Sequence, residues 1–232
     1  MSRRDAATLR ALAGRAAEAL GDADAQTVLA WAAAEFGHRL AVTSSMADSV
    51  LPHLVSQHRP GVDVLFLDTG YHFAETTGTR DRVAWELDVR VLNVRPQRTV
   101  QEQDAVLGPR LHERDPATCC RLRKVEPLAG ALAAYEAWVT GLRRHETSHR
   151  ADTPLVSWDQ RNQVVKISPL AAWTEDDVLE YAELHQVPVN PLLGEGYPSI
   201  GCAPCTRPVA PGDDPRSGRW AGFAKTECGL HQ

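Results

Sequence analysis

The sequence predicts an α/β fold, a single domain in which a mostly parallel sheet is flanked by helices. Short apolar segments alternate with segments of helical periodicity, which is the pattern of successive strand–helix–strand units. Several apolar segments are unbroken runs, typical of strands buried on both faces of a parallel sheet. The chain has 232 residues, of which 43% are hydrophobic, enough to fill the core of such a sheet.

The expected elements follow in order along the chain. Leucines and alanines at helical spacing in residues 5–36, interrupted at Gly21-Asp22, predict two N-terminal helices. Apolar runs predict strands at 40–43, 62–67, 89–94, 137–140 and 164–167. Helices are expected at 47–57, 73–87 and 121–134, the last of which Pro127 could shorten or kink. Thr174 caps a further helix, with Asp177 where a capping box normally has Glu or Gln.

The charge balance and the hydropathy exclude several classes of protein. The 25 Lys and Arg residues face 30 Asp and Glu residues, a formal charge of −5, whereas a general nucleic-acid binder has a basic surplus. No stretch approaches the roughly 18 uncharged apolar residues of a membrane span. Charged side chains among the first 25 residues leave no apolar core for a signal peptide. We therefore expect a soluble, cytoplasmic protein that binds neither nucleic acid nor membranes.

Polar turns follow three of the predicted strands, at residues 43–49, 68–71 and 140–144. Ligands of open α/β sheets bind at the carboxyl ends of the strands, so these turns predict one site assembled from distant segments. Each turn also has a simpler interpretation. Ser44-Ser45 before a helix is commonly an N-cap, and Asp68-Thr69-Gly70 is a common end to a strand.

The turn after the first predicted strand indicates a nucleotide with a short anionic tail. The sequence contains neither a P-loop nor a G-x-G-x-x-G motif. Residues 44–49 read S-S-M-A-D-S and resemble the S-G-G-x-D-S loop of ATP pyrophosphatases. Backbone N–H groups at such a strand–turn–helix junction favour an anion. Ser45 and Met46 replace the two glycines, which should crowd a triphosphate.

The five cysteines divide naturally into four and one. Cys119 and Cys120 are adjacent, Cys202 and Cys205 form a C-x-x-C pair, and Cys228 lies near the C-terminus. In a reducing compartment, such groups indicate metal binding or catalysis more than disulfides. Four thiolates suit an iron–sulfur cluster or a zinc ion, but an adjacent pair is awkward for the usual zinc geometry. The cations that would offset the charge of a four-thiolate cluster follow directly, at Arg121, Arg123 and Lys124.

Several longer strings carry a family resemblance. They are C-C-R-L-R-K-V-E-P-L from Cys119, N-P-L from Asn190, G-Y-P-S-I-G-C-A-P-C-T from Gly196, G-R-W from Gly218 and K-T-E-C-G-L-H from Lys225, together with L-D-T-G-Y from Leu67. Residues 36–232 resemble the assimilatory adenylylsulfate reductases that carry an iron–sulfur cluster. The resemblance implies an adenine nucleotide α-hydrolase-like sheet, one [4Fe–4S] cluster per chain and thioredoxin as the reductant.

The same resemblance assigns the site residues. It implies cluster ligands at Cys119, Cys120, Cys202 and Cys205, and catalytic groups at Lys124, Arg216, Arg219, Cys228 and His231. It implies nucleotide contacts at Ser44, Asp48, Leu67, Thr69, Gly141, Arg143 and Arg150. Two positions depart from the family pattern. The segment 145–149 before Arg150 reads H-E-T-S-H, and Pro116 stands where some members have histidine.

The resemblance also implies a mechanism and a division of the chain. Cys228 would attack the sulfur of adenosine 5′-phosphosulfate, AMP would leave, and thioredoxin would release sulfite from the resulting S-sulfocysteine. Glu227 beside Cys228 would raise the thiol pKa, so activation must come from a protonated His231 or from a cationic pocket. We expect a helical segment at 1–35, a nucleotide- and cluster-binding domain at 36–212, and a flexible catalytic tail at 213–232.

Other functions remain open at this stage. The nearest alternative is reduction of 3′-phosphoadenylylsulfate, or of both nucleotides, although members using that substrate typically lack the four cluster cysteines. A tRNA thiolation enzyme would need ATP and a basic RNA-binding face, and the altered loop and the negative charge oppose both. A zinc-stabilised binding module is the non-enzymatic alternative. The sequence allows a homo-oligomer.

Overall fold

The predicted α/β class is confirmed by a computed structural model, which describes residues 3–223, 225 and 227–231. In this part of the chain, six strands form one sheet in the order β3-β2-β1-β4-β6-β5. The strands are β1 (Leu40–Thr43), β2 (Val62–Leu67), β3 (Val89–Val94), β4 (Ala137–Val139), β5 (Val156–Asp159) and β6 (Val164–Ile167). All neighbours pair in parallel except β5, which runs antiparallel to β6 at one edge.

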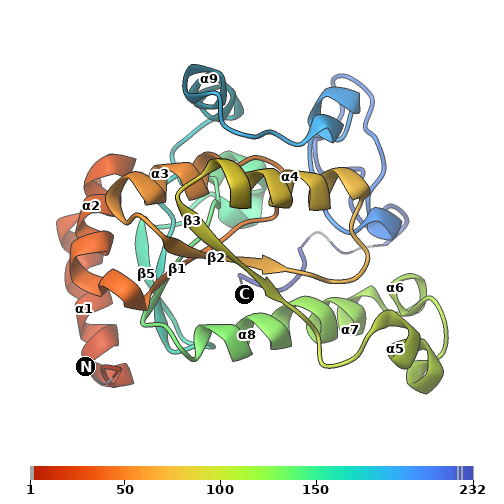
Figure 1. The fold of residues 1–232 in the computed structure, drawn as a ribbon, viewed down its shortest axis with the longest axis horizontal. Helices are drawn as coiled ribbons and strands as arrows, with labels where there is room; N and C mark the ends of the chain where they lie inside the picture. The colour runs from red at the N-terminus through yellow and green to blue at the C-terminus, as the bar shows by residue number, and fades with distance from the viewer. Residues whose placement is uncertain (1–2, 224, 226, 232) are drawn as a thin grey trace.

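Helices cover both faces of this sheet (Figure 1). They are α1 (Ala6–Ala19), α2 (Ala25–Phe36), α3 (Val50–His58), α4 (Ala74–Glu86), α5 (Val100–Leu107), α6 (Leu111–Arg114), α7 (Pro116–Cys120), α8 (Glu126–Leu132) and α9 (Glu175–His185). Figure 1 shows α3 and α4 on one side of the strands and α7 and α8 on the other, with α1 and α2 far from α5 and α6. Among the described residues, none of the helices combines the length and apolarity needed to span a bilayer.

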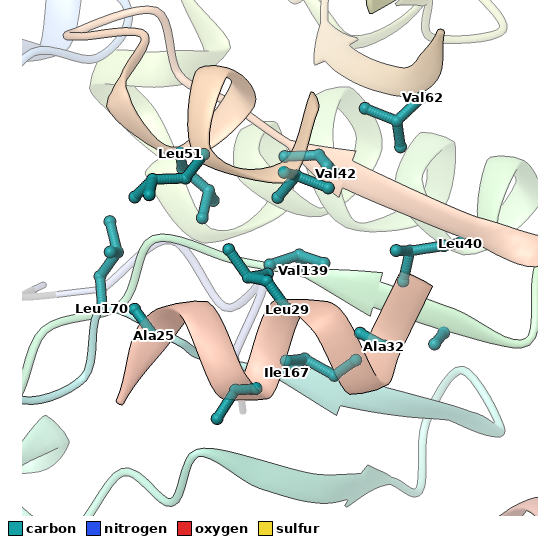
Figure 2. Close-up of a cluster of buried hydrophobic side chains, with 14 of the residues drawn as sticks. Ala25, Leu29, Ala32, Leu40, Val42, Leu51, Val62, Val139, Ile167 and Leu170 are labelled. Atoms are coloured by element: carbon teal, nitrogen blue, oxygen red, sulfur yellow. The ribbon is translucent and has the colours of Figure 1, made fainter. Parts of the chain in front are cut away.

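Alternation of side chains along the strands divides the core into two layers. In β2, Val62, Val64 and Phe66 join the larger apolar cluster, whereas Leu65 faces the opposite way and packs with Leu128 of α8. The larger cluster also receives side chains of α1, α2 and α3, some of which are drawn in Figure 2. The two N-terminal helices therefore share a core with the sheet.

Two expected helices differ from the observed ones. The first begins at Val50 instead of residue 47. The backbone oxygen of Ala47 accepts a hydrogen bond from the backbone N–H of Asn190 (3.0 Å), and Asp48 forms an isolated antiparallel β-bridge with Val189. These contacts keep residues 44–49 as an open turn. The expected helix at 121–134 is the end of a longer helical segment, in which α7 passes through a π turn at Arg121–Val125 into α8. Pro127 lies just after the π turn and does not end the helical segment, which continues to Leu132.

The turn after β1 contains a left-handed residue with a buried side chain. Met46 has a φ of 60° and is fully buried, and its side chain belongs to the larger apolar cluster. The amide of Asn190 donates to the backbone oxygen of Met46 (3.0 Å) and to the hydroxyl of Thr76 (3.2 Å). Met46 therefore points away from the surface of the turn, and of the two residues that replace the loop glycines only Ser45 is available to a ligand.

Candidate active site

A cavity of about 260 Å³ lies at the carboxyl ends of β1, β2 and β4. The turn after β1 lines it at residues 43–45, 47 and 48, and the turn after β4 lines it at residues 140–143. The second predicted turn, residues 68–71, does not line it, whereas Phe66 and Leu67 at the end of β2 do. Much of the remaining wall comes from near the end of the chain, at residues 198–201, 216, 219, 220, 227, 228, 230 and 231. Segments far apart in sequence thus meet at one edge of the sheet.

Most of the residues assigned by resemblance line this cavity. They are Ser44, Asp48, Leu67, Lys124, Gly141, Arg143, Arg150, Arg216, Arg219, Cys228 and His231. Thr69 does not. It is fully buried, and its hydroxyl lies 3.3 Å from the sulfur of Cys202, on the side of the cysteine group. Its backbone oxygen accepts a hydrogen bond from the guanidinium of Arg123 (2.5 Å).

Positive charge exceeds negative charge in the cavity wall. Five cationic side chains and three carboxylates line it: Lys124, Arg143, Arg150, Arg216 and Arg219 against Asp48, Glu146 and Glu227. Burial raises the pKa of Asp48, although a hydrogen bond from the Val50 N–H and the charge of Arg143 partly offset it. Such a wall favours a ligand with more than one negative charge.

Lys124 and Arg219 sit between the cavity and the cysteines. Burial lowers the pKa of Lys124, but the sulfurs of Cys202, Cys228 and Cys120 more than offset it, so that the pKa is raised. The pKa of Arg219 is lowered, because burial and the charge of Arg216 outweigh the attraction of the neighbouring cysteine sulfurs. Arg219 donates to the hydroxyl of Ser199 (3.2 Å) and packs over the ring of Trp220 (4.6 Å).

Gly201 allows this position of Arg219. A Cβ atom at residue 201 would collide with the guanidinium of Arg219. A larger residue at position 201 would therefore displace this guanidinium, so the glycine of the I-G-C string permits the observed position of Arg219.

The C-terminal tail is docked in the cavity by three contacts outside Cys228. The Glu227 carboxylate pairs with Arg150 through two bonds of 2.7 Å, and the backbone oxygen of Gly229 accepts a bond from Arg161 (2.8 Å). The ring of His231 stacks on Trp138 with centroids 5.6 Å apart and planes at 6°. Cys228 is half-buried and lines the cavity between these anchors.

His231 is neutral in this docked position. Burial, and then the charges of Lys166, Arg150 and Arg216, lower the pKa of its ring well below the usual value. The Nδ1 atom is buried and has no hydrogen-bond partner among the described residues. Of the two ways of activating Cys228, the protonated histidine is thus opposed by the structure, because a cationic environment keeps the ring neutral. The cationic pocket remains.

We therefore expect the ring of His231 not to titrate near pH 6.5. A histidine whose folded pKa is depressed binds its proton more readily when released, so the docked tail loses stability as the pH falls through about 6.5 and keeps it at higher pH. The ring C–H resonance that disappears in His231→Gln should stay at its neutral shift from pH 8 to 6. A synthetic peptide of the tail is the reference, and a midpoint in the protein at or above that of the peptide would contradict this assignment.

The other four cysteines line a second, smaller cavity next to the first. Cys119, Cys120 and Cys202 are buried, Cys205 is half-buried, and all are free thiols. Burial, together with the neighbouring sulfurs, raises the pKa of Cys119 to about 12 and that of Cys205 to about 11. Arg123, Lys124 and Arg219 line the same cavity.

The four sulfurs are soft ligands of the kind that bind zinc or an iron–sulfur cluster. Within the described ranges, no three His, Cys, Asp or Glu side chains are close enough together to hold one metal ion. Four sulfurs surrounding a shared cavity, with cations in its wall, match the chemistry of a thiolate-ligated iron–sulfur cluster.

Other residues of the site carry no local sequence signal. Glu146 pairs with Arg143 (3.2 Å) and with Arg150, while Arg161 reaches Gly229 from the turn between β5 and β6. Trp138 is completely buried in β4 and reads in sequence as an ordinary core residue. The roles of these residues become visible only from their contacts in the structure. Arg161 and Trp138 contact residues of the tail that are distant in sequence, whereas Glu146 contacts arginines close to it in sequence.

Comparisons with known proteins agree with this architecture. The phosphoadenosine phosphosulfate reductase domain family matches residues 39–208. Proteins described as adenosine 5′-phosphosulfate reductase in Streptomyces coelicolor and Mycolicibacterium smegmatis are each 59% identical, over 96% of this chain and 94% of theirs. A phosphoadenylyl-sulfate (PAPS) reductase from Candida auris superposes with a TM-score of 0.72 at 26% identity, covering 90% of this chain and 99% of that one. The chain therefore belongs to the phosphoadenosine phosphosulfate reductase family, as its motifs predicted.

Proposed function

We propose that this protein reduces adenosine 5′-phosphosulfate to sulfite and AMP, in assimilatory sulfate reduction. The observation that carries the proposal is the position of Cys228, a lone thiol held in a cationic cavity beside the turn after β1. The relatives that bear the name of this activity, 55–59% identical over nearly the whole chain, support the same substrate.

The chemistry starts with attack by the Cys228 thiolate on the sulfur of the bound nucleotide. A sulfur–sulfur bond forms while the bond from sulfur to the bridging oxygen breaks, and AMP leaves with that electron pair. The product on the tail is an S-sulfocysteine. AMP is a weak base, so this step needs anion stabilisation and alignment more than a strong general acid.

Cationic side chains supply that stabilisation. Lys124 and Arg219 line the cavity together with Cys228, where their charges offset the negative charge of the phosphosulfate and of the departing AMP. Arg216 shares Ser199 with Arg219, so these two guanidinium groups face the same part of the cavity. His231 contributes a neutral ring nitrogen instead of a charge.

The nucleotide would occupy the wall formed by the turns after β1 and β4. We assign its contacts to Ser44, Asp48, Leu67, Gly141, Arg143 and Arg150, which all line the cavity. Thr69 is better assigned to the support of Cys202, because its hydroxyl contacts that sulfur and not the cavity. The exposed Ser45, in place of the first loop glycine, leaves less room beside this turn for a triphosphate.

We further infer that Cys119, Cys120, Cys202 and Cys205 hold one [4Fe–4S] cluster. When bound, such a cluster organises charge beside the phosphosulfate instead of cycling between redox states. The chain's own contribution is the cationic wall of Arg123, Lys124 and Arg219, which offsets the negative charge of four thiolates. A single zinc ion is the alternative that metal analysis would distinguish.

Thioredoxin is the reductant that fits the second half of the reaction. One of its thiolates attacks the sulfur of Cys228, sulfite leaves with the electron pair, and its second thiol resolves the mixed disulfide. Residues 213–232 would act as a tail that carries Cys228 from the cavity to this partner. Cysteines that act as metal ligands and as a nucleophile, without disulfides, fit a reducing compartment, and we place the reaction in the cytoplasm.

Steady-state kinetics with the two activated sulfates test the substrate. We expect kcat/KM for adenosine 5′-phosphosulfate to exceed that for the 3′-phosphorylated nucleotide by at least about tenfold, with sulfite and AMP formed in equal amounts. The similarity to the Candida auris PAPS reductase makes the phosphorylated nucleotide the second candidate. A preference for it would overturn our choice, and ATP consumption on tRNA would overturn the reductase altogether.

A further inference from the structure

Two arginines of the cavity hold a carboxylate that belongs to the protein itself. Arg150 binds both oxygens of Glu227 at 2.7 Å, and Arg216 adds a contact of 3.4 Å. The three side chains are only 13–15% exposed. Burial alone would raise the pKa of Glu227. The hydrogen bonds from Arg150 and the charges of Arg150, Arg216 and Arg219 have the larger effect, so the pKa is lowered and the carboxylate is an anion at neutral pH.

This arrangement is an oxyanion site with an internal occupant. A planar guanidinium binds carboxylate, sulfate and phosphate with the same paired hydrogen bonds. Arg150 already has a second carboxylate partner, Glu146, on its own segment. Glu146 is fixed beside the site, whereas Glu227 reaches it from the tail and can leave with it.

Contacts on the far side of Cys228 do not depend on these arginines. Gly229 is held by Arg161, and His231 by its stack on Trp138. Loss of the Glu227 contact would therefore free residues 227 and 228 while the end of the tail keeps two anchors. Cys228 could then move relative to a bound ligand without leaving the cavity.

We propose that Glu227 is an internal ligand of the Arg150–Arg216 site and that a divalent oxyanion displaces it. In the empty protein, the carboxylate fills the site and docks the tail. When the oxyanion binds, it replaces Glu227 as the hydrogen-bond partner of Arg150 and Arg216, so the tail loses one of its three anchoring contacts. That the natural oxyanion is the phosphosulfate group rests on the proposed function, but the competition itself does not. By thermodynamic reciprocity, docking of Glu227 must also weaken binding of the oxyanion.

Proteolysis of the tail measures this competition with inorganic sulfate as the probe. Chymotrypsin can cut after Phe223, four residues before Glu227, and binding of the chain on both sides of that bond requires release of the Glu227 contact. The rate of this cut follows the population of the released segment when release is fast. We expect sulfate to accelerate tail removal from the metal-loaded wild type by about tenfold over chloride at equal ionic strength. In Glu227→Gln, removal should be faster by a similar factor without sulfate and should gain little from it. Intact-mass spectrometry follows the product, and a peptide substrate corrects for effects on the protease.

Two control variants separate this mechanism from general loosening. Glu146→Gln removes the other carboxylate from Arg150, yet leaves the tail contact, so its slow cleavage and its response to sulfate should persist. Arg161→Gln removes an anchor outside the cavity, so its tail should be cut faster while still responding to sulfate. Equal rates for wild type and Glu227→Gln, protection by sulfate, or an effect of Glu146→Gln as large as that of Glu227→Gln would each overturn the proposal.

The same proteins separate this proposal from the proposed function. Turnover of adenosine 5′-phosphosulfate together with a tail that ignores sulfate would refute only the displacement. A tail that responds to sulfate as expected, in a protein that does not reduce the nucleotide, would refute only the reductase assignment.

Discussion

Replacing Cys228 with serine is expected to reduce sulfite release by more than about a thousandfold. The serine hydroxyl is almost fully protonated near neutral pH, and the cations that stabilise a thiolate cannot compensate for this. Because Cys228 lies in the larger cavity and the other four cysteines line the smaller one, the visible spectrum should be unchanged. Incubation with ³⁵S-labelled nucleotide should label the tail peptide of the wild type and leave that of Cys228→Ser unlabelled.

A serine substitution at another cysteine tests whether the loss of sulfite release is specific to position 228 or follows from the loss of any thiol. Cys205→Ser removes one sulfur from the other cavity and should impair the cofactor, whereas Cys228→Ser should impair only transfer. Retained turnover in Cys228→Ser, or a label on another cysteine in the wild type, would remove Cys228 from the proposed role.

Serine at Cys119, Cys120, Cys202 or Cys205 should remove most of the iron and acid-labile sulfide from protein purified without air. A missing ligand weakens the retention of a metal group by at least about tenfold, and the binding free energy of such a group also stabilises the folded chain. We therefore expect colourless protein with a lower Tm and no measurable turnover. Iron and sulfide per chain, visible absorbance and thermal unfolding are the measurements.

The wild-type metal content decides between the two metal hypotheses. Four iron and four sulfide per chain are expected for the proposed cluster. Zinc without iron or sulfide would instead favour the zinc-stabilised module, and an unaltered spectrum in any one of the four serine variants would exclude that position as a ligand.

The strands were predictable because burial on both faces requires continuous apolar runs. The segments at 40–43, 62–67, 89–94 and 164–167 form strands with the expected bounds. The antiparallel strand β5 and the helices between residues 100 and 120 lack such runs and were not predicted, although Thr99 and Glu102 form a capping box at the start of α5. Start points of helices were also less certain, as α3 shows, since Asn190 and Val189 hold the preceding turn open from a distant part of the chain.

The members of the cavity could be predicted better than their contacts. Motif residues such as Lys124, Arg219 and Cys228 meet in the structure, as the resemblance implied. One partner of Glu227 is Arg150, 77 residues away, directly after the segment 145–149 that departs from the family pattern. Thr69 faces the cysteines and not the cavity. The motif alone could not predict this, because a shift of one residue at the end of a strand reverses the direction of a side chain.

The left-handed turn at Met46 restricts how the nucleotide preference of this protein could evolve. Glycine at position 46 would relieve the cost of a positive φ, yet it would also remove a fully buried side chain and leave a hole that costs about 2–5 kcal/mol. A route toward a triphosphate-binding loop through this single change would therefore pass through a less stable intermediate. Compensating growth of neighbouring side chains would have to come first, which makes the order of mutations matter.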